Sequence, residues 1–407
     1  MQALLKNMRY LCDDAQMLAG ICAAYGTADQ SECACYGRAQ EVQLTNGSFV
    51  PCERPLTPQN ICDLASLTKL IVSVMTMRLV ELGMLSLEET VGAIDPRFVH
   101  LKDVSVFDVL CYRVCLQTPG RIDDAPTREE GLLRLFDVRT APLPPVRIYS
   151  DINAMVIKYV IEARSGMPLY DTLKRHIFDP AGMKETFSTV PADLLDRCVC
   201  YNYEHRIVRD RYILRDCVPP GMPHDPKALL LCDEGSDLCG HAGLFSTASD
   251  MTRFAQALLR GELIRRDTLF SIATNRTGRY NADGSYRQPL GFLCFLKHPV
   301  QRLSEVPVYM GEHGFGISGF TGNHLVIDPD LGVFELFLGN RCHARVSHIT
   351  PPEGRTIEDF GLDEYGAGRI LWPDGRLVPT SAKYVYRKDA CLHDPIVQRM
   401  HQLGWLA

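Results

Sequence analysis

The chain has 407 residues, of which 46% are hydrophobic and 23% are charged, and its 43 Lys+Arg and 49 Asp+Glu give a net charge of −6. This composition is that of a globular protein with a full-sized core, and it excludes intrinsic disorder and collagen-like repeats. The slight acidity, without any long Lys/Arg cluster, argues against nucleic acid or an anionic membrane as a partner and favours a small-molecule substrate.

The sequence contains no apolar run of the roughly 18–20 residues that a membrane span needs. Its first residues, MQALLKNMRYLCDD, also lack the apolar stretch of a secretory signal. We therefore expect a cytoplasmic protein without a membrane partner.

The 16 cysteines fit either a disulfide framework or buried thiols that act as small hydrophobic side chains. We favour buried thiols, because a chain of this length needs no covalent staples. A zinc site is the weaker alternative, since the Cys-x-Cys pairs at 33–35 and 198–200 have no histidines at ligand spacing. We expect no metal ligands.

The first predicted elements are two short strands over residues 19–40, where β-compatible residues flank a turn at 26–29. The fold is therefore expected to begin with a hairpin. Apolar residues then recur at helical spacing from Leu64 to Gly83, which predicts a helix apolar enough to be central. Further helices are predicted over residues 104–111, 151–165, 168–178 and 248–260.

A second hairpin is predicted over residues 323–341, followed by a final helix at 394–403. This order of elements predicts an α/β (α+β) fold with one antiparallel sheet built from both chain ends and flanked by helices. In this prediction residues 1–80 and 290–407 form the sheet domain. Residues 81–289 form a mainly helical inserted lobe.

The strongest chemical signal is DLASLTK at 63–69, which places Ser66 and Lys69 on one face at the start of the central helix. This spacing brings a hydroxyl within reach of an amine, and the helix N-terminus offers a backbone N–H to a developing oxyanion. A lysine among apolar neighbours can lose its proton near neutral pH and accept one from the serine. The same pattern also occurs where a serine caps a helix and the lysine is solvated, so it needs context.

The residues around this motif resemble the serine β-lactamase and penicillin-binding-protein superfamily, in its class C-like and esterase branch, over about residues 19–345. Besides DLASLTK, the resemblance rests on YSDIN (149–153), residues 166–189, GHAGLFST (240–247) and GFTG (319–322). It implies a β-lactamase/transpeptidase-like sheet domain, an all-α lobe and an active site in the cleft between them. It implies no metal and no organic cofactor.

Carried over by position, the resemblance implies acyl transfer with Ser66 as nucleophile, Lys69 as its partner and Tyr149 as the group that relays a proton to the leaving group. A nearby cation such as Lys69 would depress the pKa of the Tyr149 phenol. Asp151, counted here with the substrate-binding residues, stands where most members carry Asn. An anion there would keep Lys69 protonated and shift the proton transfer onto Tyr149. Asn153 is expected to lie at the start of a helix or to support the residues of the site without contacting substrate.

The third family element, Lys/His-Thr/Ser-Gly, aligns with Ile317-Ser318-Gly319, so its cation is missing. Ser318 is expected to offer its hydroxyl to a substrate carboxylate or carbonyl, and Gly319 to permit close approach. The backbone N–H of Phe320 would complete an oxyanion hole with that of Ser66. Loss of one charge-assisted hydrogen bond weakens carboxylate binding by ~1.5–3 kcal/mol. His313 is a candidate to compensate.

Other segments carry weaker predictions. Residues 110–115 replace a family stretch that shapes the cleft, and His224, Asp225 and His241 are expected to be structural. Arg341 is expected either to face the cleft or to brace the sheet edge, and we favour the second. Residues 352–407 contain no motif that we recognise.

These observations predict a serine hydrolase that cleaves an ester or amide, with esterase, carboxypeptidase or weak β-lactamase activity. The expected partner is a small ester, amide or peptidoglycan-like molecule, and a homo-oligomer is compatible with the sequence. The alternative is a catalytically degenerate member that serves as a ligand-binding or regulatory module, which Ile317 and Asp151 favour. A zinc-binding structural protein is a more distant alternative.

Overall fold

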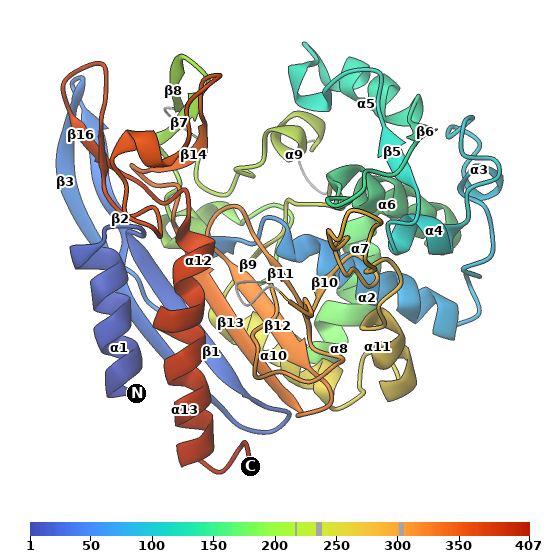
Figure 1. Cartoon of the computed structure of the whole chain (residues 1–407). Helices are drawn as coiled ribbons and strands as arrows, with labels where there is room; N and C mark the ends of the chain where they lie inside the picture. The colour runs from blue at the N-terminus through green and yellow to red at the C-terminus, as the bar shows by residue number, and fades with distance from the viewer. Residues whose placement is uncertain (216–217, 233–237, 301–304) are drawn as a thin grey trace.

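The computed structural model describes residues 1–215, 218–232, 238–300 and 305–407. Its centre is a sheet of seven strands in the order β10-β11-β12-β13-β1-β2-β3 (Figure 1), in which every pairing is antiparallel. The strands are β1 (Gly20–Thr27), β2 (Ser31–Thr45), β3 (Ser48–Pro55), β10 (Phe295–Leu296), β11 (Phe315–Ser318), β12 (His324–Asp328) and β13 (Val333–Gly339). The predicted antiparallel sheet from both chain ends is confirmed, as are both hairpins, β1–β2 and β12–β13.

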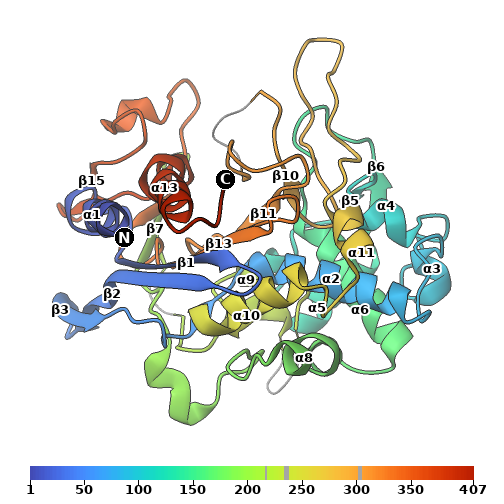
Figure 2. The same ribbon diagram turned by 90° about the horizontal axis from the view of Figure 1, so that it is seen from below.

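Helices cover both faces of this sheet (Figure 2). Side chains alternate between the faces along β1, as the period of a strand requires. Ile21, Ala23 and Tyr25 belong to an apolar cluster with α1 (Gln2–Arg9) and α13 (Asp394–Gln402). The intervening Cys22 and Ala24 belong to the main core on the other face, with α2 (Leu67–Glu81) and α10 (Ala248–Leu259).

The N-terminus differs from the prediction, because α1 and the helical turn η1 (Tyr10–Asp14) precede the first hairpin. Leu4, Met8 and Leu11 are buried at helical spacing. The expectation that the fold begins with a hairpin is therefore wrong, since this short amphipathic segment gains its stability by packing on the sheet.

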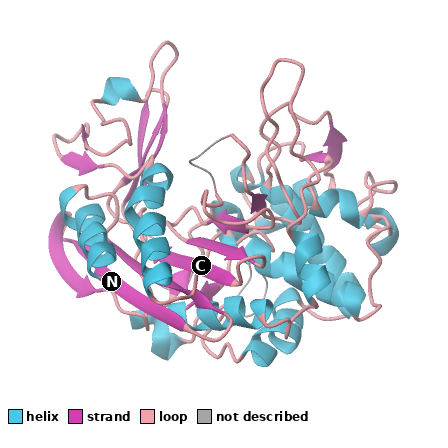
Figure 3. Ribbon diagram, turned by 60° about the horizontal axis from the view of Figure 1, so that its bottom comes forward, coloured by secondary structure: helices cyan, strands magenta, loops and turns pink. Residues whose placement is uncertain are grey.

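A group of helices lies to one side of the sheet, with short strands among them (Figure 3). The predicted helices correspond to α2, α4 (Val106–Leu110), α6 (Asp151–Ser165), α7 (Leu169–Leu173) with η3 (Lys174–Phe178), α10 and α13. Further helices and turns are α3 (Val91–Ile94), η2 (Ile122–Asp124), α5 (Arg128–Phe136), α8 (Asp179–Ala181), η4 (Ala192–Arg197), α9 (Pro226–Leu231), α11 (Arg266–Ile272), η5 (Glu358–Phe360), α12 (Tyr384–Lys388) and η6 (Asp389–His393).

Several short strands lie outside the main sheet and were not predicted. They form the pairs β4 (Cys62–Asp63) with β9 (Phe245–Ser246), β5 (Cys115–Gln117) with β6 (Arg139–Ala141), and β15 (Arg369–Leu371) with β16 (Leu377–Pro379), and the three-stranded sheet of β14 (Val346–Thr350), β7 (Glu204–Val208) and β8 (Arg211–Arg215).

The helix α10 contacts β1 and β13, although it falls within residues 81–289. The division into two domains at residues 80 and 290 stays a prediction.

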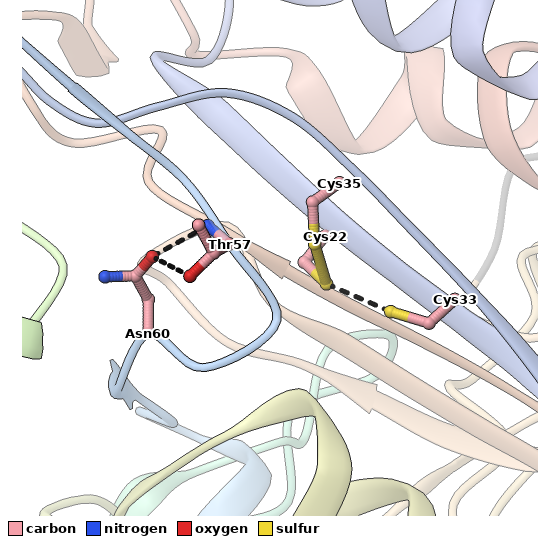
Figure 4. The surroundings of a disulfide bond; sticks show 5 residues. All are labelled: Cys22, Cys33, Cys35, Thr57 and Asn60. Atoms are coloured by element: carbon pink, nitrogen blue, oxygen red, sulfur yellow. Dashed lines mark hydrogen bonds between the residues drawn. A yellow bond between two sulfur atoms is a disulfide. The ribbon is translucent and has the colours of Figure 1, made fainter.

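Among the described cysteines, eight free thiols are buried, as expected: Cys12, Cys62, Cys111, Cys198, Cys239, Cys294, Cys342 and Cys391. One disulfide, which was not predicted, joins Cys22 to Cys35, and the Sγ of Cys33 lies 3.4 Å from that of Cys22 (Figure 4). The two bonded residues face each other across β1 and β2.

In the part of the chain that the structure describes, no helix has both the length and the apolar character of a membrane span.

Candidate active site

Ser66 stands at the end of a tightly held turn, directly before α2. Ala65 adopts a left-handed backbone conformation with φ of 47°, which is uncommon for a residue with a Cβ. The buried carboxylate of Asp63 accepts the N–H of Ala65 at 2.8 Å and that of His224 at 2.7 Å. Ser66 makes no side-chain capping bond to the helix. The alternative of a simple capping serine therefore does not describe this site.

Lys69 is completely buried one turn into α2. Its Nζ lies 2.8 Å from Ser66 Oγ, 3.1 Å from the carbonyl oxygen of His241 and 2.8 Å from Asp151 Oδ1. An ammonium group has three N–H donors, and each has an acceptor here. Burial lowers the pKa of Lys69, but the carboxylate of Asp151 outweighs burial, and the pKa lies above the usual lysine value. Lys69 is therefore a cation, as the sequence analysis expected from Asp151.

Asp151 belongs to a ring of alternating charges. Its second oxygen lies 3.1 Å from Lys227 Nζ, which also contacts Asp225 at 3.4 Å, and Asp225 is 2.9 Å from His241 Nε2. Burial raises the pKa of Asp151, but Lys69, His241 and Lys227 outweigh it and hold the pKa well below its usual range. Both carboxylate oxygens are thus bound to ammonium groups, and Asp151 also lines the cavity, so its contact with substrate stays a prediction. Lys227 was missed because only the tertiary fold brings it here.

Tyr149 directly precedes the residue that caps α6, and its hydroxyl lies 3.4 Å from Ser66 Oγ. Its ring is stacked on Phe295 with centroids 4.8 Å apart and is tilted against Tyr112 at 5.7 Å. Tyr112 comes from the segment 110–115 that departs from the family pattern, so this segment supports the tyrosine. The structure brings Ser66, Lys69 and Tyr149 together, as the sequence predicted.

The charge state of Tyr149 differs from the expectation. Burial raises the pKa of its phenol; Lys69 lowers it, Asp151 raises it further, and the net pKa lies above the usual tyrosine value. The predicted depression of this pKa is wrong, because burial of the phenol, together with the carboxylate of Asp151, outweighs the effect of Lys69. Tyr149 is therefore a neutral phenol.

These groups open onto a cavity of about 650 Å³. Ser318, Gly319 and Phe320 line it together with Ser66 and Tyr149. The C-terminal segment also contributes to the wall, although no motif marked it. Its lining residues are Ala382, Tyr384, Val385, Tyr386 and Lys388.

Gly319 lets the end of β11 approach the turn before Ser66. A Cβ at this position would lie 2.8 Å from the carbonyl oxygen of Leu64. Among the residues that the structure describes, neither the N–H of Ser66 nor that of Phe320 has a hydrogen-bond acceptor. This leaves both predicted oxyanion donors unengaged.

The segment Ile317-Ser318-Gly319, which aligns with the third family element, has contacts that differ from those predicted. Ile317 is fully buried in the main core. The hydroxyl of Ser318 donates to Glu305 and lies 3.0 Å from Nδ1 of His324. The hydroxyl proton of Ser318 is therefore already engaged, whereas the sequence analysis expected it to be offered to substrate. His313 instead contacts Asp330 at 3.1 Å and is not among the residues that line the cavity. The prediction that His313 replaces the missing cation is wrong, because Asp330 holds it.

Two supporting residues behave as expected. Asn153 is buried and donates to the carbonyl of Val109 at 2.8 Å, which ties α6 to α4. Arg341 donates to the carbonyl oxygens of Phe320 at 2.6 Å and Ser381 at 3.0 Å. It therefore braces the sheet edge, and it also lines the cavity.

Three groups of side chains have metal-like ligand sets among the described residues: Asp151, Asp225 and His241; Glu204, His224 and Cys342; and Cys22, Cys33 and Cys35. In the first group the carboxylates already carry the ammonium groups of Lys69 and Lys227. In the second, Arg206 lies 2.8 Å from Glu204. In the third, two of the thiols form the disulfide. None of these sets fits a resident cation in its present state.

Sequence comparison finds curated relatives among bacterial proteins. N-acetylmuramyl-L-alanine amidase of Bacillus subtilis (strain 168) is 27% identical over 335 residues, which cover 75% of this chain and 74% of that protein. A putative D-alanyl-D-alanine carboxypeptidase of Salmonella paratyphi B is 28% identical over 208 residues, which cover 49% of this chain and 46% of that protein. The chain therefore spans about half the length of the Salmonella relative.

Solved structures show the same fold. The LovD6 mutant of simvastatin synthase from Aspergillus terreus matches with a TM-score of 0.64 at 15% identity, covering 97% of this chain and 95% of that one. EstCE1, a hydrolase with promiscuous acyltransferase activity, matches with a TM-score of 0.63 at 18% identity and coverages of 83% and 94%. A class C β-lactamase matches with a TM-score of 0.60 at 16% identity and coverages of 83% and 90%.

The fold is thus the β-lactamase/transpeptidase-like one, with an antiparallel sheet and flanking helices. Residues 35–355 match the β-lactamase family, and this stretch includes the serine, lysine and tyrosine of the cavity. The chain belongs to the β-lactamase family.

Proposed function

We propose that this member of the β-lactamase family is a serine hydrolase that cleaves a small ester or amide through an acyl-Ser66 intermediate. The observation that carries the proposal is the contact of Ser66 Oγ with Lys69 Nζ at 2.8 Å and with Tyr149 at 3.4 Å, beside an open cavity. A nucleophile within hydrogen-bond reach of its proton acceptor is the geometry that covalent catalysis needs.

Acylation begins when Ser66 Oγ attacks the substrate carbonyl. The neutral Tyr149 takes the proton of Ser66 and passes its own hydroxyl proton to the leaving group, so no phenolate has to form. The Lys69 ammonium stabilises negative charge on Ser66 Oγ during the attack. The N–H groups of Ser66 and Phe320 are the donors for the carbonyl oxyanion.

Deacylation follows the same route with water as the nucleophile. Tyr149 takes a proton from water as the water oxygen attacks the acyl carbon, and it returns its own proton to Ser66. The acid product then leaves, and the original protonation states are restored.

The substrate class follows from the relatives and from the third family element. The named amidase and carboxypeptidase act on amide bonds, which supports an amide or ester of peptidoglycan-like origin. Ile317 supplies no cation for a substrate carboxylate. We therefore propose esterase or amidase activity in preference to strong β-lactamase activity.

One observation favours a second candidate, a ligand-binding module without catalysis. Lys69 forms the 2.8 Å ion pair with Asp151, which opposes its use as a base. However, Lys69 keeps its contact with Ser66, and Ile317 lies in the core and leaves the cavity open. These features support the hydrolase.

Intact-mass spectrometry after incubation with a fluorophosphonate, a β-lactam and a p-nitrophenyl ester tests the proposal. Wild type and a control with the exposed Ser48 replaced, Ser48→Ala, are expected to gain an adduct with at least one reagent, and Ser66→Ala none. Folded wild-type protein that gains no adduct would establish the binding module. An adduct retained in Ser66→Ala would refute Ser66 as the nucleophile.

A further inference from the structure

Glu305 is an additional carboxylate at the wall of the cavity. The other acidic residues that line this cavity have cationic partners: Asp151 and Asp225 contact lysines, and Asp123 forms an ion pair with Arg121. Across the described ranges, Glu305 has no lysine or arginine within ion-pair distance. Its partners are Ser318 and His324.

The contacts of Glu305 form a directed chain of hydrogen bonds. His324 is 1% exposed, and burial keeps its pKa well below the usual histidine value, so the ring is neutral. An N–H on its Nδ1 donates to Ser318 Oγ at 3.0 Å, and the Ser318 hydroxyl donates to Glu305. In this direction each proton has one acceptor, and the chain of donors ends on the carboxylate of Glu305.

Glu305 lines the same cavity as Ser66 and Tyr149. Ser318 directly precedes Gly319, whose backbone approaches Leu64 and Ala65 at the turn that ends on Ser66. The position that provides a cation in related sequences is therefore occupied by buried Ile317, and an anion is presented beside it.

We propose that Glu305, held by Ser318 and His324, binds an ammonium group of the substrate. The substrates are then esters or amides whose acyl part carries a primary amine near the scissile carbonyl, as in an aminoacyl ester or amide. This inference rests on the proposed hydrolase function and assigns its substrate class. A charge-assisted hydrogen bond of this kind gives about a 10- to 100-fold preference for the amine over its uncharged acyl derivative.

The test compares benzyl esters of D-alanine and L-alanine with the corresponding N-acetyl-alanine benzyl esters, measured as kcat/KM by release of benzyl alcohol. Wild type is expected to prefer the free amine of at least one enantiomer by about 10- to 100-fold. Glu305→Gln keeps an acceptor for Ser318 but not the charge, so this preference should fall at least about tenfold. Glu305→Asp, which keeps the charge, should retain part of it.

The exposed Glu353 provides the matched control: Glu353→Gln removes the same charge outside the cavity and should keep the wild-type ratio. Hydrolysis of both esters by wild type without preference for the amine would overturn the inference and leave the proposed function intact. A preference that survives in folded Glu305→Gln would also overturn it. If neither ester is hydrolysed and Ser66 gains no adduct, the proposed function fails and the inference fails with it.

Discussion

The ion pair of Lys69 and Asp151 sets the charge state of the site, and Asp151→Asn removes it without changing the size of the side chain. Lys69 is completely buried, and the two groups are 2.8 Å apart. At an effective dielectric constant of about 20, charges at this separation attract by about 6 kcal/mol. Breaking a buried pair by removing one partner typically costs about 3–5 kcal/mol. We expect the free energy of unfolding to fall by that amount near pH 7.

The loss should depend on pH because Lys69 can release its proton. In wild type its pKa is raised above the unfolded value of 10.5, so its stabilising contribution is fully present below that pH. Without the carboxylate, burial becomes the dominant influence and lowers the pKa of Lys69. The unfolded variant then binds more protons than the folded one, so the variant gains stability as the pH rises toward 10.5.

Urea unfolding of wild type and Asp151→Asn between about pH 6 and pH 10 measures this effect. The difference in unfolding free energy should be largest near neutrality and shrink as the pH rises. The exposed carboxylate of Asp171 provides a control, and Asp171→Asn should change stability little at any pH. A constant difference across the range, or none at pH 7, would refute the electrostatic argument.

Three further predictions follow from single contacts. Tyr149→Phe should lower the rate of Ser66 acylation, followed by intact mass, by about 10²–10⁴-fold through loss of the proton relay, with little change in Tm; an unchanged rate would contradict the relay. Gly319→Ala places a Cβ 2.8 Å from the backbone oxygen of Leu64, so it should lose about 1–3 kcal/mol of stability in urea; full stability would show that β11 can withdraw. His343 accepts the N–H of Glu41 at 3.0 Å, and burial lowers its pKa from 6.5 to about 4. As the pH falls from 6.5 to about 4, the unfolded state takes up the proton of this histidine before the folded state does. The free energy of unfolding of wild type should therefore decrease by up to about 3 kcal/mol over this range. The free energy of unfolding of His343→Gln should decrease less over the same pH range. An equal pH dependence of the two proteins in urea unfolding would contradict the lowered pKa of His343.

The regular elements were predictable where the pattern of apolar residues is local. The helix predicted over 151–165 has the same bounds in the structure. Both hairpins fall where β-compatible residues flank a turn. The helix α1 was missed although Leu4, Met8 and Leu11 have helical spacing. Such a short segment has little helical stability alone, and its contact with α13 across the same face depends on residues from the other chain end.

The site was predictable in part for the same reason. Ser66 and Lys69 meet because they lie one helical turn apart, and the tyrosine motif came from family resemblance. The charge of Tyr149 was not predictable, because burial and the carboxylate of Asp151 oppose the lysine. The partners of Ser318 were missed as well, since Glu305 is 13 residues away in sequence.

The sequence by itself therefore determined the antiparallel sheet with its helices and the pairing of Ser66 with Lys69, because these depend on local periodicity and motif spacing. Its resemblance to a known family indicated the family and Tyr149. Only the tertiary structure decided the ionisation of Tyr149, the double engagement of Asp151, the anion beside Ser318 and the contribution of residues 382–388 to the cavity wall. Charges and cavity walls are set by distances between segments remote in sequence, and those distances exist only after the chain has folded.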